Sequence, residues 1–137
     1  MNKIIKTLAL TTSLGIIIYW TLVFTHIFPV QEIYPGYSDW FMSFPAADLW
    51  IATTSMLVIY YQTKNFKLAN IFLTAAGSGL IFLGIYAFAY GYRTGLLFQL
   101  TSDELIEIGI KIYCLSVGGY FIYMSYQGLS NEKQKPT

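Results

Sequence analysis

The ionisable residues inside the apolar part of the chain are the first candidates for chemistry. Glu107 and Lys111 are four residues apart in the segment TSDELIEIGIK, residues 101–111. In a helix this spacing places both side chains on one face, with the acid nearer the N-terminus, which is the favourable order for an ion pair. Two interpretations stay open. The pair is structural, with Lys111 extending toward the lipid headgroups, or it faces a ligand or handles protons.

A second acid, Asp48, lies in the segment SFPAADLW, three residues after Pro45. If a helix begins at Pro45, Asp48 belongs to its first turn, where the helix dipole favours an acid. If the helix begins at Ser38 or Asp39, Pro45 introduces a kink and Asp48 lies inside the membrane. The sequence leaves both a helix-start role and a functional role open for Asp48.

Three further polar residues lie at the same end of the apolar segments. His26 lies near the end of the first segment and Arg93 near the end of the third, with Tyr86 two turns earlier on the face of Arg93. His26 is either a hydrogen-bonded anchor or an acid–base group, and Arg93 is either an interfacial residue or a ligand for an anionic headgroup or carboxylate. The candidate ligand-binding residues are therefore His26, Asp48, Tyr86, Arg93, Glu107 and Lys111. We expect them to form an outward-facing polar pocket between helices.

Four apolar segments must position these residues, at about residues 8–28, 44–61, 68–90 and 105–126. A helix needs roughly 20 residues to cross the hydrocarbon core of a bilayer. Helices are expected because lipid offers no partners to backbone polar groups. Thr101 and Glu104 form a capping-box pattern, which predicts that the last helix begins near residue 102. The sequence therefore predicts an all-α integral membrane four-helix bundle.

The basic residues predict how the bundle is oriented. Six lysines flank the segments on one side, and Arg93 is the basic residue on the other; the lysines are Lys3, Lys6, Lys64, Lys67, Lys133 and Lys135. Because basic residues favour the cytoplasmic side, we expect an antiparallel up-down topology in the cell membrane, with both termini cytoplasmic. Residues 1–128 form the expected four-span domain, and residues 129–137 a disordered cytoplasmic tail.

Composition excludes several classes of protein. Hydrophobic residues make up 55% of the chain and charged residues 11%, which is too few charges to coat the surface of a soluble domain. The net charge of +1 argues against nucleic acid as a partner. One cysteine, Cys114, and one histidine argue against internal disulfides and a zinc site, and no cofactor is predicted. The expected partner is the lipid bilayer.

Glycines recur every seven residues in the third segment, at Gly77, Gly84 and Gly91. Such a ridge of small residues allows helices to approach closely. The ridge predicts either packing within the bundle or homodimerisation.

Four functions are compatible with this pattern. The first is binding of a lipid headgroup, a small amphiphile or a partner at the outer pocket. The second is an enzyme that uses His26, Asp48 and Glu107 for acid–base chemistry on an apolar substrate. This arrangement resembles, in layout only, the four-helix EXPERA domain of sterol isomerase-type proteins. The third is a structural accessory subunit. The fourth is a transporter of the small multidrug type, which is disfavoured because the first segment carries no acid.

Overall fold

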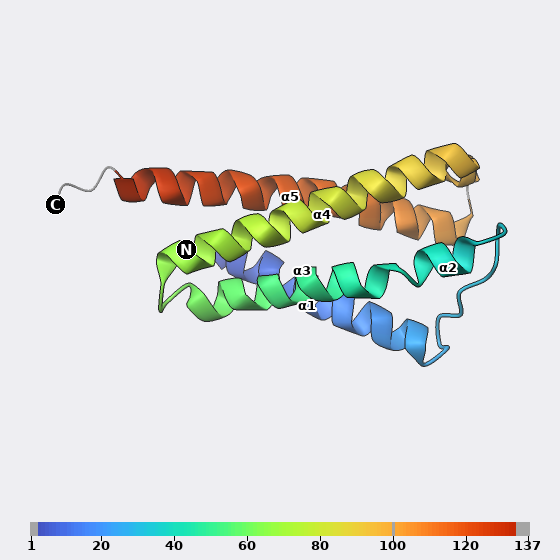
Figure 1. The fold of residues 1–137 in the computed structure, drawn as a ribbon, viewed down its shortest axis with the longest axis horizontal. Helices are drawn as coiled ribbons and strands as arrows, with labels where there is room; N and C mark the ends of the chain where they lie inside the picture. The colour runs from blue at the N-terminus through green and yellow to red at the C-terminus, as the bar shows by residue number, and fades with distance from the viewer. Residues whose placement is uncertain (1–2, 100, 134–137) are drawn as a thin grey trace. The chain divides into compact units, whose positions relative to one another are not determined.

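The computed structural model describes residues 3–99 and 101–133, and its regular structure is helical throughout (Figure 1). The helices are α1 (Lys3–Phe24), α2 (Tyr37–Phe41), α3 (Phe44–Tyr61), α4 (Phe66–Thr94), the short 3-10 helix η1 (Leu96–Phe98) and α5 (Ser102–Lys133). Within these described residues there is no strand. The predicted all-α class is therefore confirmed.

Four stretches of helix in the described ranges are long and apolar enough to cross a membrane: Lys3–Phe24, Tyr37–Tyr61, Phe66–Thr94 and Glu104–Ser130. Large apolar side chains remain exposed along them; for example, Ile18 is 57% exposed and Phe82 is 62% exposed. Exposed apolar side chains on long helices suit contact with lipid. The described residues thus include four helical stretches with the length and apolar character that crossing a membrane requires.

The observed helix boundaries differ from the predicted ones, mostly by extending into polar flanking residues. Helix α3 covers the predicted 44–61, but α1 begins at Lys3 rather than at residue 8 and ends at Phe24 rather than at residue 28. Helix α5 continues to Lys133, so the predicted tail at 129–137 begins inside a helix, while residues 134–137 lie outside the described residues. Lysine, glutamine and glutamate favour helix, so the helices continue beyond the apolar stretches.

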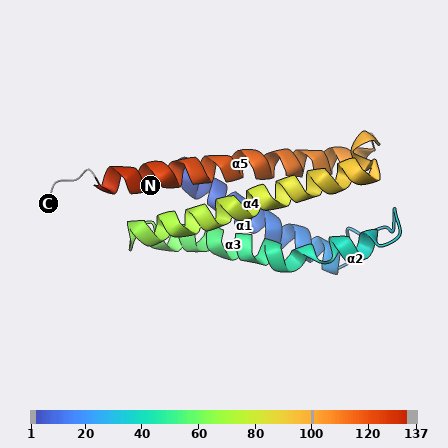
Figure 2. The ribbon, with the colours of Figure 1, turned by 45° about the horizontal axis from the view of Figure 1, so that its top comes forward.

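The chain divides into two compact units, which we call the first unit (residues 1–72) and the second unit (residues 73–137). In the first unit, α1 and α3 lie side by side and run in opposite directions (Figures 1 and 2). In the second unit, the remainder of α4 packs antiparallel against α5. Each unit is thus built on one antiparallel pair of long helices.

The glycine ridge of α4 is packed against α5 inside the second unit. A Cβ atom added to Gly77 would lie 2.8 Å from the carbonyl oxygen of Gly118, and one added to Gly84 would lie 2.8 Å from the side chain of Leu115. Only a residue without a side chain permits such an approach. The ridge therefore serves packing within the chain. Homodimerisation through it stays a prediction, and would require these glycines to leave α5.

The loop before α2 is held by one carboxylate. Glu32 accepts hydrogen bonds from the backbone N–H of Gly36 at 2.6 Å and of Ser38 at 2.9 Å. Gly36 has φ of 83°, a left-handed conformation that glycine adopts without steric penalty. The acid thus satisfies free N–H groups at the start of α2.

Candidate functional site

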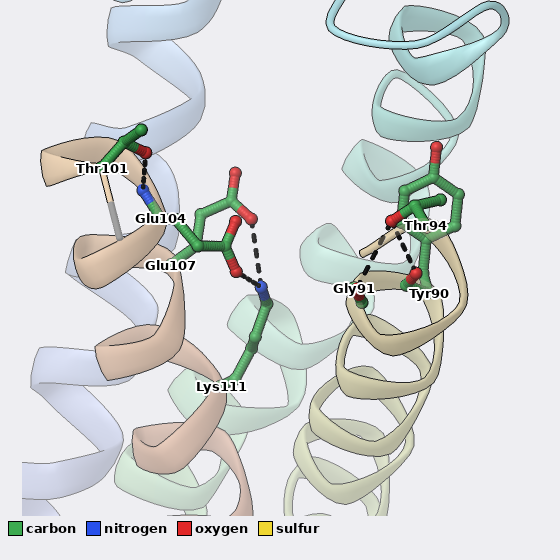
Figure 3. A network of polar contacts seen from close by, with 7 residues as sticks. All are labelled: Tyr90, Gly91, Thr94, Thr101, Glu104, Glu107 and Lys111. Atoms are coloured by element: carbon green, nitrogen blue, oxygen red, sulfur yellow. Dashed lines mark hydrogen bonds and ion pairs between the residues drawn. The ribbon is translucent and has the colours of Figure 1, made fainter. Parts of the chain in front are cut away.

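Three charged side chains of α5 form an ion cluster near its N-terminus (Figure 3). The Nζ atom of Lys111 lies 2.9 Å from Oε1 of Glu104 and 3.2 Å from Oε2 of Glu107. The side chains of Lys111 and Glu104 are 6% exposed, whereas that of Glu107 is 29% exposed. The predicted ion pair of Glu107 and Lys111 is confirmed, and Glu104 is an unpredicted third member.

The sequence carried a signal for Glu104 that the capping-box pattern obscured. Glu104 is seven residues before Lys111, and seven residues make almost two full helical turns, so both lie on one face. The backbone N–H of Glu104 does donate to Oγ1 of Thr101 at 3.3 Å, which is half of a capping box. Its carboxylate binds Lys111 instead of reaching back, and the N–H of Thr101 donates to the carbonyl of Gln99.

Helix α4 leaves room for the ammonium group of this cluster. A Cβ atom built on Gly91 would lie 3.7 Å from Nζ of Lys111. One turn later, the hydroxyl of Thr94 donates to carbonyl oxygens of its own helix, those of Tyr90 at 2.9 Å and Gly91 at 3.5 Å. Figure 3 shows Gly91 and Thr94 on α4 beside the cluster. The lysine head therefore lies close to α4 at Gly91, where a Cβ atom would make only an ordinary van der Waals contact with it.

The charges of the cluster do not balance. Two carboxylates and one ammonium carry a net charge of −1 when all three groups are ionised. Charges in a low-dielectric environment are tolerated only when they are paired, so the buried Glu104 depends on Lys111. The remaining negative charge favours the approach of a cation from the partly exposed side, where Glu107 lies.

Asp48 belongs to a different contact, in the first unit. Helix α3 begins at Phe44 with Pro45 close to its N-terminus, and the separate helix α2 precedes it. The helix therefore starts at the proline, but Asp48 lies beyond the first turn. The indole Nε1–H of Trp20 donates to Oδ2 of Asp48 at 2.7 Å, which joins α1 to α3.

Trp20 was not predicted as a partner of Asp48. A tryptophan inside an apolar segment has an indole N–H that must find an acceptor when it is buried, and Trp20 is 7% exposed. The need for an acceptor was therefore the feature of the sequence that indicated a polar partner for Trp20. The sequence offered no direct way to choose Asp48 as the acceptor, because the register between two helices depends on the loop that joins them.

His26 has a backbone role in the structure. It is exposed and has φ of 58°, a left-handed conformation, directly after α1 ends. Its N–H donates to the carbonyl of Val23 at 3.0 Å, and the N–H of Phe28 donates to that of Leu22 at 3.0 Å. A left-handed residue with such bonds is a common way to end a helix. A ligand-binding or acid–base role for His26 stays a prediction.

Tyr86 and Arg93 lie on a different face of α4 from the ion cluster. Both are exposed, and the ring of Tyr86 stacks on that of Phe82 with centroids 5.9 Å apart. Each follows a glycine of the ridge by two residues, which turns its side chain by about 200° from the α5-facing side. The second unit thus brings Glu107 and Lys111 together without these two residues. Ligand binding by Tyr86 and Arg93 stays a prediction.

Among the residues that the structure describes, no three His, Cys, Asp or Glu side chains gather in a way that could hold a metal ion. Comparisons with protein-family models, with curated proteins and with solved structures find no match to this chain. The fold and the ion cluster define the class on their own: the described part of the chain has four helices apolar enough to span a membrane, with a charged cluster on the last of them.

Proposed function

We propose that the chain is a multi-pass protein of the cell membrane, an up-down four-helix bundle with both termini cytoplasmic. Six lysines flank the helices on the side assigned to the cytoplasm, and Arg93 lies at the other. The antiparallel helix pair within each unit is compatible with this topology. In this orientation the N-terminus of α5, and with it the cluster of Glu104, Glu107 and Lys111, lies at the outer surface.

The cluster binds the positively charged head of a lipid or small amphiphile. The observation that carries this proposal is the buried Lys111, held by two acids and leaving a net negative charge in a helix apolar enough to cross lipid. Ionisable groups in such helices are costly, and they commonly mark a site. Glu107 is the more exposed of the two acids, so the head approaches from its side.

A primary ammonium head fits this charge best. It supplies several N–H donors to carboxylate oxygens, and hydrogen bonds between charged groups are stronger than neutral ones. A choline head has the same charge but no N–H donor, so it binds more weakly. A net anionic head such as phosphatidylglycerol is repelled by the cluster. Phosphatidylethanolamine is therefore the lipid class that we expect to bind.

A second candidate function is structural. Glu104 and Lys111 are both 6% exposed and already paired, which suits a clamp that fixes the start of α5 without any ligand. The acid–base enzyme using His26, Asp48 and Glu107 stays an alternative hypothesis, although Asp48 already accepts a hydrogen bond from Trp20. The two functions differ in one testable respect. If the cluster binds a ligand, the stability of the protein depends on the lipid headgroup; if the cluster is a structural clamp, it does not.

Titration with short-chain lipids tests this difference. In neutral detergent, we expect phosphatidylethanolamine to raise the unfolding temperature more than phosphatidylcholine does, and phosphatidylglycerol to have little effect, because a ligand stabilises the state that binds it. Glu107→Gln should weaken the apparent affinity for phosphatidylethanolamine about 10-fold or more, as expected for a charge-assisted hydrogen bond worth roughly 1.5–3 kcal/mol.

Asp39→Asn is the matched control, because it removes the same charge from an exposed residue of α2. This variant should bind phosphatidylethanolamine as the unchanged protein does. Equal stabilisation by all three lipids, or an ethanolamine response that survives Glu107→Gln, would leave the structural clamp as the better account.

A further inference from the structure

Two serine hydroxyls are completely buried in the first unit. Ser13 of α1 and Ser55 of α3 are both 0% exposed, and the Oγ atoms of both lack a hydrogen-bond partner among the residues that the structure describes. Several other hydroxyls on these helices donate to a carbonyl three or four residues back; they are Thr11, Thr21 and Thr54. Ser13 and Ser55 differ from these threonines, because their buried hydroxyls do not bond to their own helices.

The register between α1 and α3 places these two serines at the same level. The hydrogen bond between Trp20 and Asp48 fixes one pair of opposed positions on the antiparallel helices. Ser13 is seven residues before Trp20, and Ser55 is seven residues after Asp48. Seven residues correspond to about 10 Å along each axis and return to almost the same face. The two hydroxyls thus share one level of the interface between α1 and α3.

We infer that Ser13 and Ser55 together bind a buried water molecule between α1 and α3. A hydroxyl transferred from water without a new hydrogen bond is strongly disfavoured, and a water bridging two hydroxyls satisfies both at once. The second unit offers a comparison, because there Thr74 of α4 donates directly to Ser125 of α5 at 2.8 Å. The serines of the first unit make no such direct bond, which leaves a bridging molecule as their partner.

The residues near the two serines along each helix are also buried. Ala9 is one turn from Ser13, Ala52 is about one turn from Ser55, and both alanines are buried. Val58, on the next turn of α3, is 0% exposed. Thr12 and Thr54, which adjoin the two serines in the sequence, are buried as well. Both serines belong to the first unit, so the water position is independent of the ligand proposed for the second unit.

Magnetisation transfer from water, measured by solid-state NMR on the full chain in lipid bilayers, tests this inference. We expect rapid transfer to Ser13 and Ser55 and none to Val58, which is equally buried but apolar. In Ser13→Ala the transfer to Ser55 should fall to the level of Val58, because one water serves both residues. For the same reason, the transfer to Ser13 should fall to that level in Ser55→Ala. Ser78→Ala is the control, since Ser78 is exposed and donates to the carbonyl of Ala75.

Two results would overturn the inference. If Ser55 keeps its transfer from water in Ser13→Ala, the serines do not share a molecule. If neither serine receives transfer in the unchanged protein, they bond directly to each other or lack any partner. A double variant with Ser13→Ala and Ser55→Ala tests whether misfolding explains a loss of transfer. It should keep the helical spectrum of the unchanged protein and lose transfer from water only at residues 13 and 55.

Discussion

Lys111→Met is expected to lower the free energy of unfolding by about 3–5 kcal/mol, the loss typical of breaking a buried ion pair by removing one partner. The substitution keeps the length and the apolar stem of the side chain but removes the charge that Glu104 and Glu107 share at 2.9 Å and 3.2 Å. Glu104, whose side chain is 6% exposed, would then lose the cation with which it is paired. Reversible unfolding in mixed detergent micelles, followed by circular dichroism, measures the change.

Two controls separate the ion cluster from a general effect of losing a lysine. Lys67→Met changes an exposed lysine of α4 and should alter stability by no more than about 0.5 kcal/mol. A triple variant with Glu104→Gln, Glu107→Gln and Lys111→Met should recover much of the loss, because it leaves no unpaired charge. A Lys111→Met protein as stable as Lys67→Met would show that the cluster is not buried as described.

Gly118→Ala is expected to lower the free energy of unfolding by about 1–3 kcal/mol, as overpacking of a close contact does. A Cβ atom at Gly118 would lie 2.8 Å from the carbonyl oxygen of Gly77 and 2.9 Å from the side chain of Ile81. The carbonyl belongs to a helix backbone and cannot rotate away, so α4 and α5 must separate. The same unfolding measurement in mixed micelles detects the loss.

The adjacent glycine provides a matched control for this substitution. A Cβ atom at Gly119 would have nothing within 4 Å. Gly119→Ala should therefore stabilise the helix by up to about 1 kcal/mol, since alanine favours helix more than glycine does. Equal effects of the two substitutions would contradict the close packing of α4 on α5.

Local patterns in the sequence predicted the elements well, because they depend on neighbouring residues. The apolar stretch 44–61 gives α3, since Pro45 suits the start of a helix and the polar residues after Tyr61 end it. Thr101 marks the start of α5 for the same local reason. The pair of Glu107 and Lys111 follows from helical spacing alone.

Contacts between helices could not be predicted with the same success. The bond between Trp20 and Asp48 depends on the relative register of α1 and α3, which the intervening loop and α2 determine. The left-handed His26 has none of the glycine or asparagine character that usually signals such a helix end. The sequence allowed two partners for the Glu104 carboxylate, the backbone N–H of Thr101 in a capping box and the ammonium group of Lys111. The structure shows the pair with Lys111, which lies two turns away.

Native mass spectrometry of the protein, released gently from its own membrane, tests the proposed ligand most directly. The account predicts a retained adduct with the mass of an amine-headed lipid or amphiphile on the unchanged protein and on Asp39→Asn, and its loss from Glu107→Gln. An adduct with an anionic head, or an amine adduct that Glu107→Gln retains, would contradict binding at the cluster of Glu104, Glu107 and Lys111. The absence of any adduct from the unchanged protein would contradict it as well, and would favour the structural clamp.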